Sequence, residues 1–299
     1  VGKLWGVGKV TQKTLATHGV QTIQDLLDFP KETLENIVGT NAARLRQLAR
    51  GIDAPYDEIS YLVAGINHQA WYLRFRHNGE DAYPRLRAAT KESEEFADEQ
   101  VRVELMDQFG YFVTESSKHL SEYLPYFRRD EVLREQYHLQ SRAKELPVSM
   151  TNNRRRVWQD EIEDGDLPNL NRSNEYASAI IESVVTGDPF SFNGNVMNHG
   201  LITNLPDGCC VEVPCLVDRE GVHPCHVGAL PPQCAALNWT NIAVIESAVR
   251  AIQNRDREAA FHAVALDPLT AAQLTLPNIR KMFDEMWAAE RNLLSYFEQ

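Results

Sequence analysis

The chain has 299 residues, enough for one large domain or two ordinary ones with a sizeable buried core. Hydrophobic residues make up 43% and charged residues 24%, as in globular proteins, and no apolar run reaches the roughly 18 residues that span a bilayer. The net charge is −12: residues 1–53 carry seven basic and five acidic side chains, whereas the remainder carries 23 and 37, so we expect this body to repel nucleic acid.

The five cysteines indicate a reducing environment. Their number is odd and they all fall in one stretch, unlike the cysteines of an exported disulfide scaffold. The N-terminus has no basic stretch followed by an apolar core, so we expect no secretory signal. We therefore predict a cytoplasmic protein with free thiols and no membrane partner. The cysteines are Cys209, Cys210, Cys215, Cys225 and Cys234.

Residues 1–53 are predicted to form a small all-helical domain. Helices are expected at 11–18, 21–28 and 40–50, and they end at or before Gly19, Pro30 and Gly51. The glycines provide turns between the helices.

The loop Gly6-Val-Gly8-Lys9-Val-Thr11 is too close to the N-terminus to follow the strand that a dinucleotide fingerprint requires. Together with 22–26 and 49–53 it resembles the helix-hairpin-helix in the thumb region of Y-family DNA polymerases. The resemblance implies contacts from Gly6, Gly8 and Lys9 to DNA phosphates. The alternative is a helical appendage that binds no DNA. The metal-binding palm is absent, so no polymerase chemistry is expected.

Residues 54–299 are predicted to form a second, mixed α/β domain, which makes the whole chain α+β. A buried strand is expected at 59–66 and an alternating strand at 69–76. A charged helix at 91–109 and a short strand at 110–115 follow. Further helices are predicted at 121–146, 173–186, 237–254 and 267–297, and strands and turns fill 195–217.

Two polar stretches follow predicted strands. His68 lies where the first strand ends, and a neutral imidazole there can bind a metal, although a structural histidine fits the same position. Residues 111–127 combine hydroxyls, a carboxylate, a histidine and aromatic rings, which suits a sugar site; core packing of the aromatic rings is the alternative. The cysteine spacings contain no C-x₂-C pair and disfavour structural zinc.

Segments 59–68, 83–87, 109–127, 174–178, 194–224 and 226–237 resemble, in order, the melibiase-type α-galactosidases of glycoside hydrolase family 4. The family departs from the usual two-carboxylate glycosidases by using NAD. The resemblance implies that NAD oxidises the C3 hydroxyl of an α-galactoside, that a base removes the C2 proton, and that the glycosidic oxygen is then eliminated. Water adds and the ketone is reduced again. A divalent metal, usually Mn²⁺, polarises the C2 and C3 oxygens.

The resemblance also assigns residues. His68 matches the metal-binding histidine, and Tyr123 matches the tyrosine that removes the C2 proton, which at an ordinary pKa near 10 needs a nearby cation. Asn67, His119 and His199 match positions close to the substrate.

The chain departs from the family pattern before residue 54. The NAD-binding Rossmann domain and the Cys-His-Ser motif, which supplies a second metal ligand, find no match there, so His68 has no evident partner. We expect a fusion near Asp53 that hydrolyses no glycoside by itself. The rival interpretations are a DNA- or phosphate-binding module on an inert body, and a homo-oligomer formed through the helices at 237–254 and 267–297.

Overall fold

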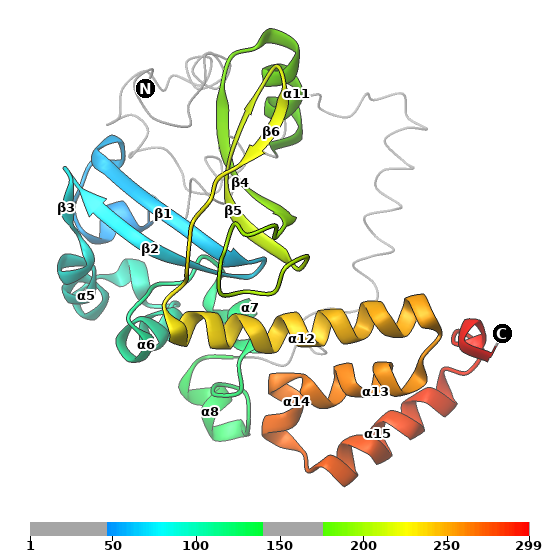
Figure 1. Cartoon of the computed structure of the whole chain (residues 1–299). Coiled ribbons are helices and arrows are strands. Elements are labelled where there is room, and N and C mark those ends of the chain that lie inside the picture. Colours follow the sequence, from blue (N-terminus) through cyan, green and yellow to red (C-terminus); the bar gives the residue numbers. More distant parts are fainter. Residues whose placement is uncertain (1–46, 140–175, 299) are drawn as a thin grey trace, which may run out of the picture.

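The computed structural model describes residues 47–139 and 176–298. A twisted antiparallel sheet stands on a layer of helices, and the long helix α12 runs beneath it (Figure 1). The strand order is β3-β2-β1-β5-β4, with β6 paired to β5. The strands are β1 (Ile59–Ile66), β2 (Gln69–His77), β3 (Glu80–Asp81), β4 (Phe190–Met197), β5 (Cys210–Asp218) and β6 (Gly221–Pro224).

The hairpin of β1 and β2 has two apolar faces because its residues alternate between two cores. Ala64, Ile66 and Trp71 face a core shared with β5 and α12. Val63 and Phe75 face a second core on the opposite side of the hairpin. Side chains on a strand point alternately to opposite faces, so a continuous apolar run such as 59–66 marks a strand that is covered on both sides.

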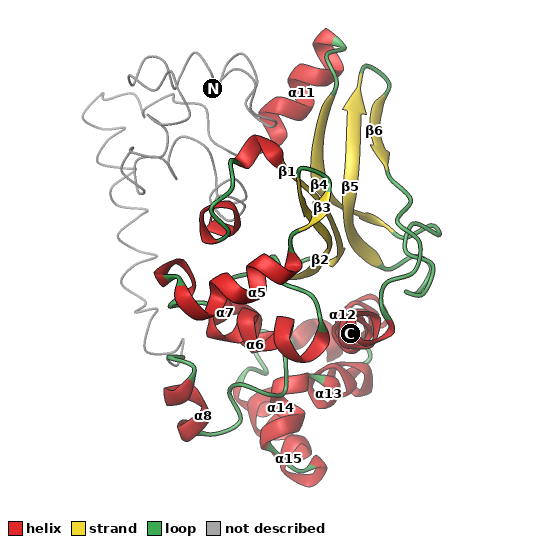
Figure 2. Cartoon of the chain, turned by 90° about the vertical axis from the view of Figure 1, so that its left-hand side faces the viewer, coloured by secondary structure: helices red, strands yellow, loops and turns green. Residues whose placement is uncertain are grey.

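Helices cover these faces. Figure 2 shows α5, α6 and α7 grouped beside the β1–β2 hairpin, and Figure 1 shows α13, α14 and α15 stacked below α12. The bounds are α5 (Tyr83–Glu92), α6 (Gln100–Phe109), α7 (Ser117–Leu120), α8 (Glu131–Gln136), α11 (Tyr176–Thr186), α12 (Pro232–Asn254), α13 (Arg257–Leu266), α14 (Pro268–Gln273) and α15 (Leu276–Ala289). Short 3₁₀ turns are η1 (Tyr56–Glu58), η2 (Glu94–Phe96), η3 (Ser121–Tyr123) and η4 (Ser295–Glu298). None of the described helices combines the length and apolar character needed to cross a membrane.

The strands were predicted better than the helices. β1 and β2 lie where the sequence indicates. β5 falls in the predicted strand region 195–217 except for Asp218, whereas β4 begins earlier, at Phe190. The helix expected at 91–109 is observed only in its second half, as α6. Its first half is wrong, because α5 ends at Glu92 and the Ser93 side chain caps η2 by accepting from the backbone N–H of Glu95. The strand expected at 110–115 is also wrong, since only Val113 pairs, in a single bridge to Trp71.

The described end of the predicted first domain packs against the body. Leu48 and Ile52 are buried in the second core, and Arg50 forms a hydrogen-bonded ion pair with Glu95 at 2.8 Å. The helix-hairpin-helix expected in residues 1–53, with Gly6, Gly8 and Lys9, otherwise lies outside the described residues. The domain boundary at Asp53 stays a prediction.

Candidate functional site

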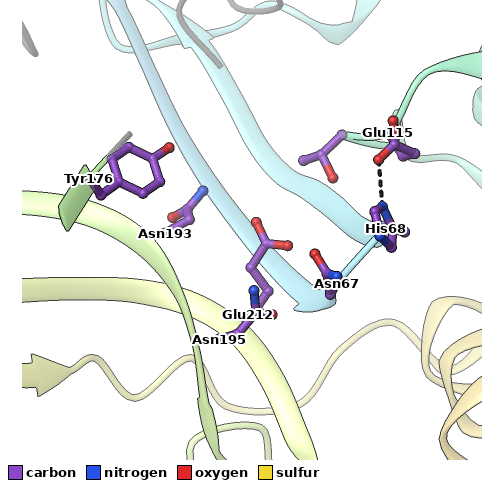
Figure 3. Close-up of a pocket in the computed structure, with 8 residues that line it drawn as sticks. Asn67, His68, Glu115, Tyr176, Asn193, Asn195 and Glu212 are labelled. Carbon is purple, nitrogen blue, oxygen red and sulfur yellow. Dashed lines mark hydrogen bonds and ion pairs between the residues drawn. The ribbon is translucent and has the colours of Figure 1, made fainter. Parts of the chain in front are cut away.

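The turn between β1 and β2 places the predicted metal-binding histidine. Ile66 pairs with Gln69, so Asn67 and His68 form a two-residue loop, and His68 adopts a left-handed conformation with φ of 63°. This region is uncommon for residues other than glycine, and such strain is often found at functional positions. The His68 Nδ1 atom lies 2.7 Å from Glu115 Oε2 (Figure 3).

Glu115 is a buried carboxylate with several partners. Glu115 as a whole is only 7% exposed, and its Oε1 atom accepts a hydrogen bond of 2.7 Å from the Ser116 backbone N–H. The chain before it is tied to the hairpin, since Thr114 N donates to Ala70 O and Val113 bridges Trp71. A buried carboxylate requires such partners because an unpaired charge is costly away from water.

His119 on α7 and Tyr123 on η3 complete a cluster around His68. The His119 Nδ1 atom lies 3.6 Å from Glu115 Oε2, and His119 Nε2 lies 3.3 Å from the Tyr123 hydroxyl. The Tyr123 and His68 rings are stacked, with centroids 5.5 Å apart and an interplanar angle of 16°. Since His119 and Tyr123 are four residues apart on consecutive helical turns, both side chains point to the same side. Residues distant in the chain therefore converge on one small volume.

His68, Glu115 and His119 form a plausible set of metal ligands by chemistry and by distance. One ligand atom from each lies within 4.8 Å of the others. Two imidazole nitrogens and one carboxylate oxygen make a donor set that divalent first-row transition metals accept. The expectation that His68 has no partner is therefore wrong, because its partners come from residues after it in the chain.

A polar hollow of about 160 Å³ adjoins this cluster. In Figure 3 the side chains of Glu212 and Asn193 point into the same space as Asn67. Amides and carboxylates side by side offer both donors and acceptors for hydroxyl groups. The lining residues are Asn67, His68, Thr114, Glu115, Tyr176, Asn193, Asn195 and Glu212.

A family model described as the family 4 glycosyl hydrolase C-terminal domain matches residues 63–270. The chain belongs to glycoside hydrolase family 4. It is 40% identical to an α-galactosidase of Bacillus subtilis (strain 168), over 85% of this chain and 59% of that protein. It is 33% identical to an α-galactosidase of Rhizobium meliloti (strain 1021), over 84% of this chain and 54% of that protein.

This family 4 chain spans little more than half the length of those curated relatives. The solved 6-phospho-α-glucosidase from gut microorganisms in complex with NAD and Mn²⁺ has the same fold, with a TM-score of 0.62, at 20% identity over 83% of this chain and 58% of that one. The predicted resemblance to family 4 is confirmed. The polymerase resemblance of residues 1–53 gains no support, because the matching family and the relatives named above are glycosidases.

Among the predicted residues, His199 lies away from the cluster around His68. His199 lies in the loop after β4 with its side chain 72% exposed, and its Nδ1 atom is 3.6 Å from Asp207 Oδ1. Tyr123 contacts the histidine cluster but lines a second hollow of about 340 Å³, with Leu237 and Leu266 among its neighbours. The roles assigned to Asn67, His68, His119, Tyr123 and His199 stay predictions.

Sequence reasoning missed several residues of this region. Asn193 and Asn195 lie two apart on β4, and Glu212 pairs with Asn195 across the strands. Polar residues at every second position of an otherwise apolar strand indicate a shared face, and this signal was available in the sequence. The role of Glu115 as the partner of His68 had no such signal, because it depends on the path of the chain after α6.

The cysteines play no part in the ligand cluster found among residues 47–139 and 176–298. Burial raises the pKa of the Cys234 thiol to about 12 and that of the Cys209 thiol to about 11. Both thiols therefore remain protonated at neutral pH, which lowers their reactivity as nucleophiles. All five cysteines are free.

Proposed function

We propose that this chain supplies the metal- and sugar-binding part of an α-galactosidase-like glycoside hydrolase that depends on NAD and Mn²⁺. One observation carries the proposal: in a family 4 domain, His68, Glu115 and His119 converge, Tyr123 contacts both histidines, and a polar hollow is lined by His68 and Glu115. The names of the α-galactosidase relatives support the substrate class. The Mn²⁺ and NAD in the related glucosidase structure support the cofactors.

In this proposal His68, Glu115 and His119 hold the divalent metal. When bound, NAD supplies reversible oxidation of a sugar hydroxyl and the metal supplies Lewis-acid polarisation of sugar oxygens. A carboxylate at Glu115, next to both imidazoles, favours a cation at this position. Its burial excludes water from one side of the cluster.

Tyr123 is proposed to take the proton from C2 of the sugar at its phenolic oxygen. That oxygen already lies 3.3 Å from His119 Nε2, so the imidazole fixes the direction of the hydroxyl. An adjacent cation stabilises a phenolate and brings the tyrosine closer to the working range of a general base. The metal ligands and Tyr123 thus share His119 as a common neighbour.

The polar hollow is proposed to bind the galactose ring. Asn193, Asn195 and Glu212 provide acceptors and donors from neighbouring strands, and Asn67 adds a fourth polar side chain beside His68. Sugar hydroxyls both donate and accept hydrogen bonds, so a mixed lining of this kind binds them with defined orientation.

Hydrolysis of p-nitrophenyl α-galactoside in the presence of NAD and Mn²⁺ tests the activity. The chain is assayed together with the part of the Bacillus subtilis α-galactosidase that it does not match. We expect release of nitrophenol, and a reduction of about 10²-fold or more for Tyr123→Phe, the range typical of a lost general base. Tyr126→Phe, at a 45% exposed tyrosine nearby, is the matched control and should keep the activity.

Direct binding of Mn²⁺ to the chain gives a second measurement that does not need the complementing part. Free Mn²⁺ is measured by electron paramagnetic resonance during a titration. Equal binding by the wild type and by a His68→Ala/His119→Ala double variant would refute the metal assignment. The homo-oligomer and the DNA contact of Gly6, Gly8 and Lys9 stay predictions from the sequence.

A further inference from the structure

A buried polar cluster on α12 lies directly behind the residues proposed as the site. Asn238 is fully buried and Asn241 is 6% exposed. The two are three residues apart, so they lie on the same face of the helix, which is the face turned toward the hairpin. Buried amides in an otherwise apolar contact are costly unless their hydrogen bonds are made.

Both asparagines bind the residue that follows His68. Asn238 Nδ2 donates to the backbone oxygen of Gln69 at 2.8 Å and to Gln69 Oε1 at 3.1 Å. Asn241 Nδ2 donates to the same Oε1 at 2.9 Å. Gln69 is itself fully buried, and it closes the turn by pairing with Ile66. The turn carrying His68 is therefore held on its inner side by α12.

The same amide of Asn241 reaches the second segment of the site. Its Nδ2 atom donates to the backbone oxygen of Tyr123 at 3.1 Å. Gln69 and Tyr123 are far apart in the chain, and Asn241 connects them through a single nitrogen. Because the side chains of His68 and Tyr123 stack on each other, the spacing of these two backbone segments sets the spacing of the rings.

The orientation of the Gln69 amide follows from its neighbours. Asn238 and Asn241 both present NH₂ groups to it, so the oxygen of Gln69 must face them. Its Nε2 atom is buried without a hydrogen bond. A buried donor without a hydrogen bond lowers the stability of the fold. The two hydrogen bonds at Gln69 Oε1 offset part of this loss.

Gly65 provides independent support for the importance of this contact. A Cβ atom at this position would lie 2.5 Å from the backbone oxygen of Gln69 and 3.3 Å from Asn238 Oδ1. The backbone φ of 156° is also one that other residues rarely adopt. The closest contacts are with the backbone of β2, including Ala70 Cα at 2.8 Å, so glycine keeps the hairpin closed at the point where Asn238 binds it. The Asn238 Oδ1 atom also accepts the indole N–H of Trp71 at 3.1 Å.

We propose that Asn241 is a positioning residue that fixes Tyr123 against His68 by joining the backbone of Tyr123 to the side chain of Gln69. Asn238 supports it by holding Gln69 in place. Neither asparagine touches the reacting groups. The expected effect on Mn²⁺ binding rests on the proposed function. The positions of His68 and Tyr123 relative to each other do not, and NMR measures them without any metal or substrate.

The test compares the wild-type chain with Asn241→Ala and Asn241→Asp. Alanine removes the donor and suits a helix interior, so it should fold. Aspartate keeps the shape but places an acceptor opposite two acceptor oxygens. Histidine Hε1 signals are recorded by NMR, with the His68 signal assigned through His68→Gln. We expect the ring-current shift that Tyr123 imposes on His68 to be lost in both variants, and the affinity for Mn²⁺ to fall about tenfold, as for outer partners of metal ligands.

Asn198→Ala is the matched control. Asn198 is 1% exposed, and its Nδ2 atom donates to three backbone oxygens of a loop, at 2.9, 3.0 and 3.2 Å. Its loss should lower the melting temperature as much as Asn241→Ala, while the His68 signal and the Mn²⁺ affinity stay at wild-type values.

Two results would overturn the proposal: an unchanged His68 signal in folded Asn241→Ala, or an equal change of that signal in Asn198→Ala. A wild-type chain that binds no Mn²⁺ refutes the proposed metal site instead, and the NMR comparison then still decides the role of Asn241.

Discussion

The two ends of the β1–β2 hairpin carry the same pair of side chains in different surroundings. At the turn, His68 Nδ1 lies 2.7 Å from Glu115 Oε2; at the open end, His77 Nε2 lies 2.7 Å from Glu58 Oε2. The Glu115 side chain is 9% exposed, whereas that of Glu58 is 40% exposed. A histidine next to a glutamate is therefore not sufficient to mark a site.

The neighbours of each pair make the difference. The pair at the turn adjoins a second histidine and a tyrosine, and a buried amide cluster holds its backbone. At the open end, the other ring nitrogen of His77, Nδ1, lies 2.7 Å from the guanidinium of Arg85. A cation next to the imidazole disfavours metal binding there. The site is thus defined by which groups converge and by their burial.

The largest expected effect concerns the packing beneath the open end. Leu48 is fully buried against the second core, so Leu48→Ala should reduce the free energy of unfolding by about 2–5 kcal/mol. Denaturant unfolding measures this change. Leu293→Ala, at an 80% exposed leucine, should have almost no effect. If the two ends of the hairpin are independent, Leu48→Ala leaves the Mn²⁺ affinity of the folded chain unchanged. A loss of Mn²⁺ affinity together with the loss of stability would show that they are coupled.

The next effect separates the two carboxylates directly. Glu115→Gln removes a charge and an acceptor from the ligand cluster, and we expect the affinity for Mn²⁺ to fall about 10- to 100-fold. Glu58→Gln makes the same chemical change at the other end and should leave the affinity at the wild-type value. A calorimetric titration of both variants measures the difference. If both substitutions lower the affinity for Mn²⁺ to the same extent, the affinity depends only on the overall charge of the protein, and Glu115 is not a specific ligand.

Sequence reasoning succeeded where a local pattern carries the information. The strand at 59–66 was predicted from its continuous apolar run and is observed as β1. The metal-binding role of His68 came from the family resemblance and stays a prediction. The pairing of His68 with Glu115 was missed, because it depends on how the segment after α6 returns to the hairpin. The role of Asn241 was missed as well, since an amide within a helix gives no sign of the distant backbone that it binds.

The smallest effect sharpens the comparison through pH. Hydrogen bonds from His77 and Asn78 lower the pKa of Glu58 from its ordinary value of 4.5. A carboxylate with a lowered pKa in the folded state stabilises the fold above its ordinary pKa and loses this contribution as the pH falls through the folded-state value. The wild type should therefore be slightly more stable than Glu58→Gln at pH 7, and the difference should disappear in acid below pH 4.5.

Thermal unfolding of both proteins from pH 7 down to pH 3 measures this difference, and Glu220→Gln serves as a control for the loss of one exposed charge. Because Glu58 is exposed, water and salt weaken its bonds, and the expected shift in melting temperature is small. If the difference in stability between the wild type and Glu58→Gln grows as the pH falls, the pKa of Glu58 is not lowered in the folded state. A large difference at pH 7 would mean that the exposed pair contributes as much as a buried one, and burial would then no longer distinguish the two ends of the hairpin.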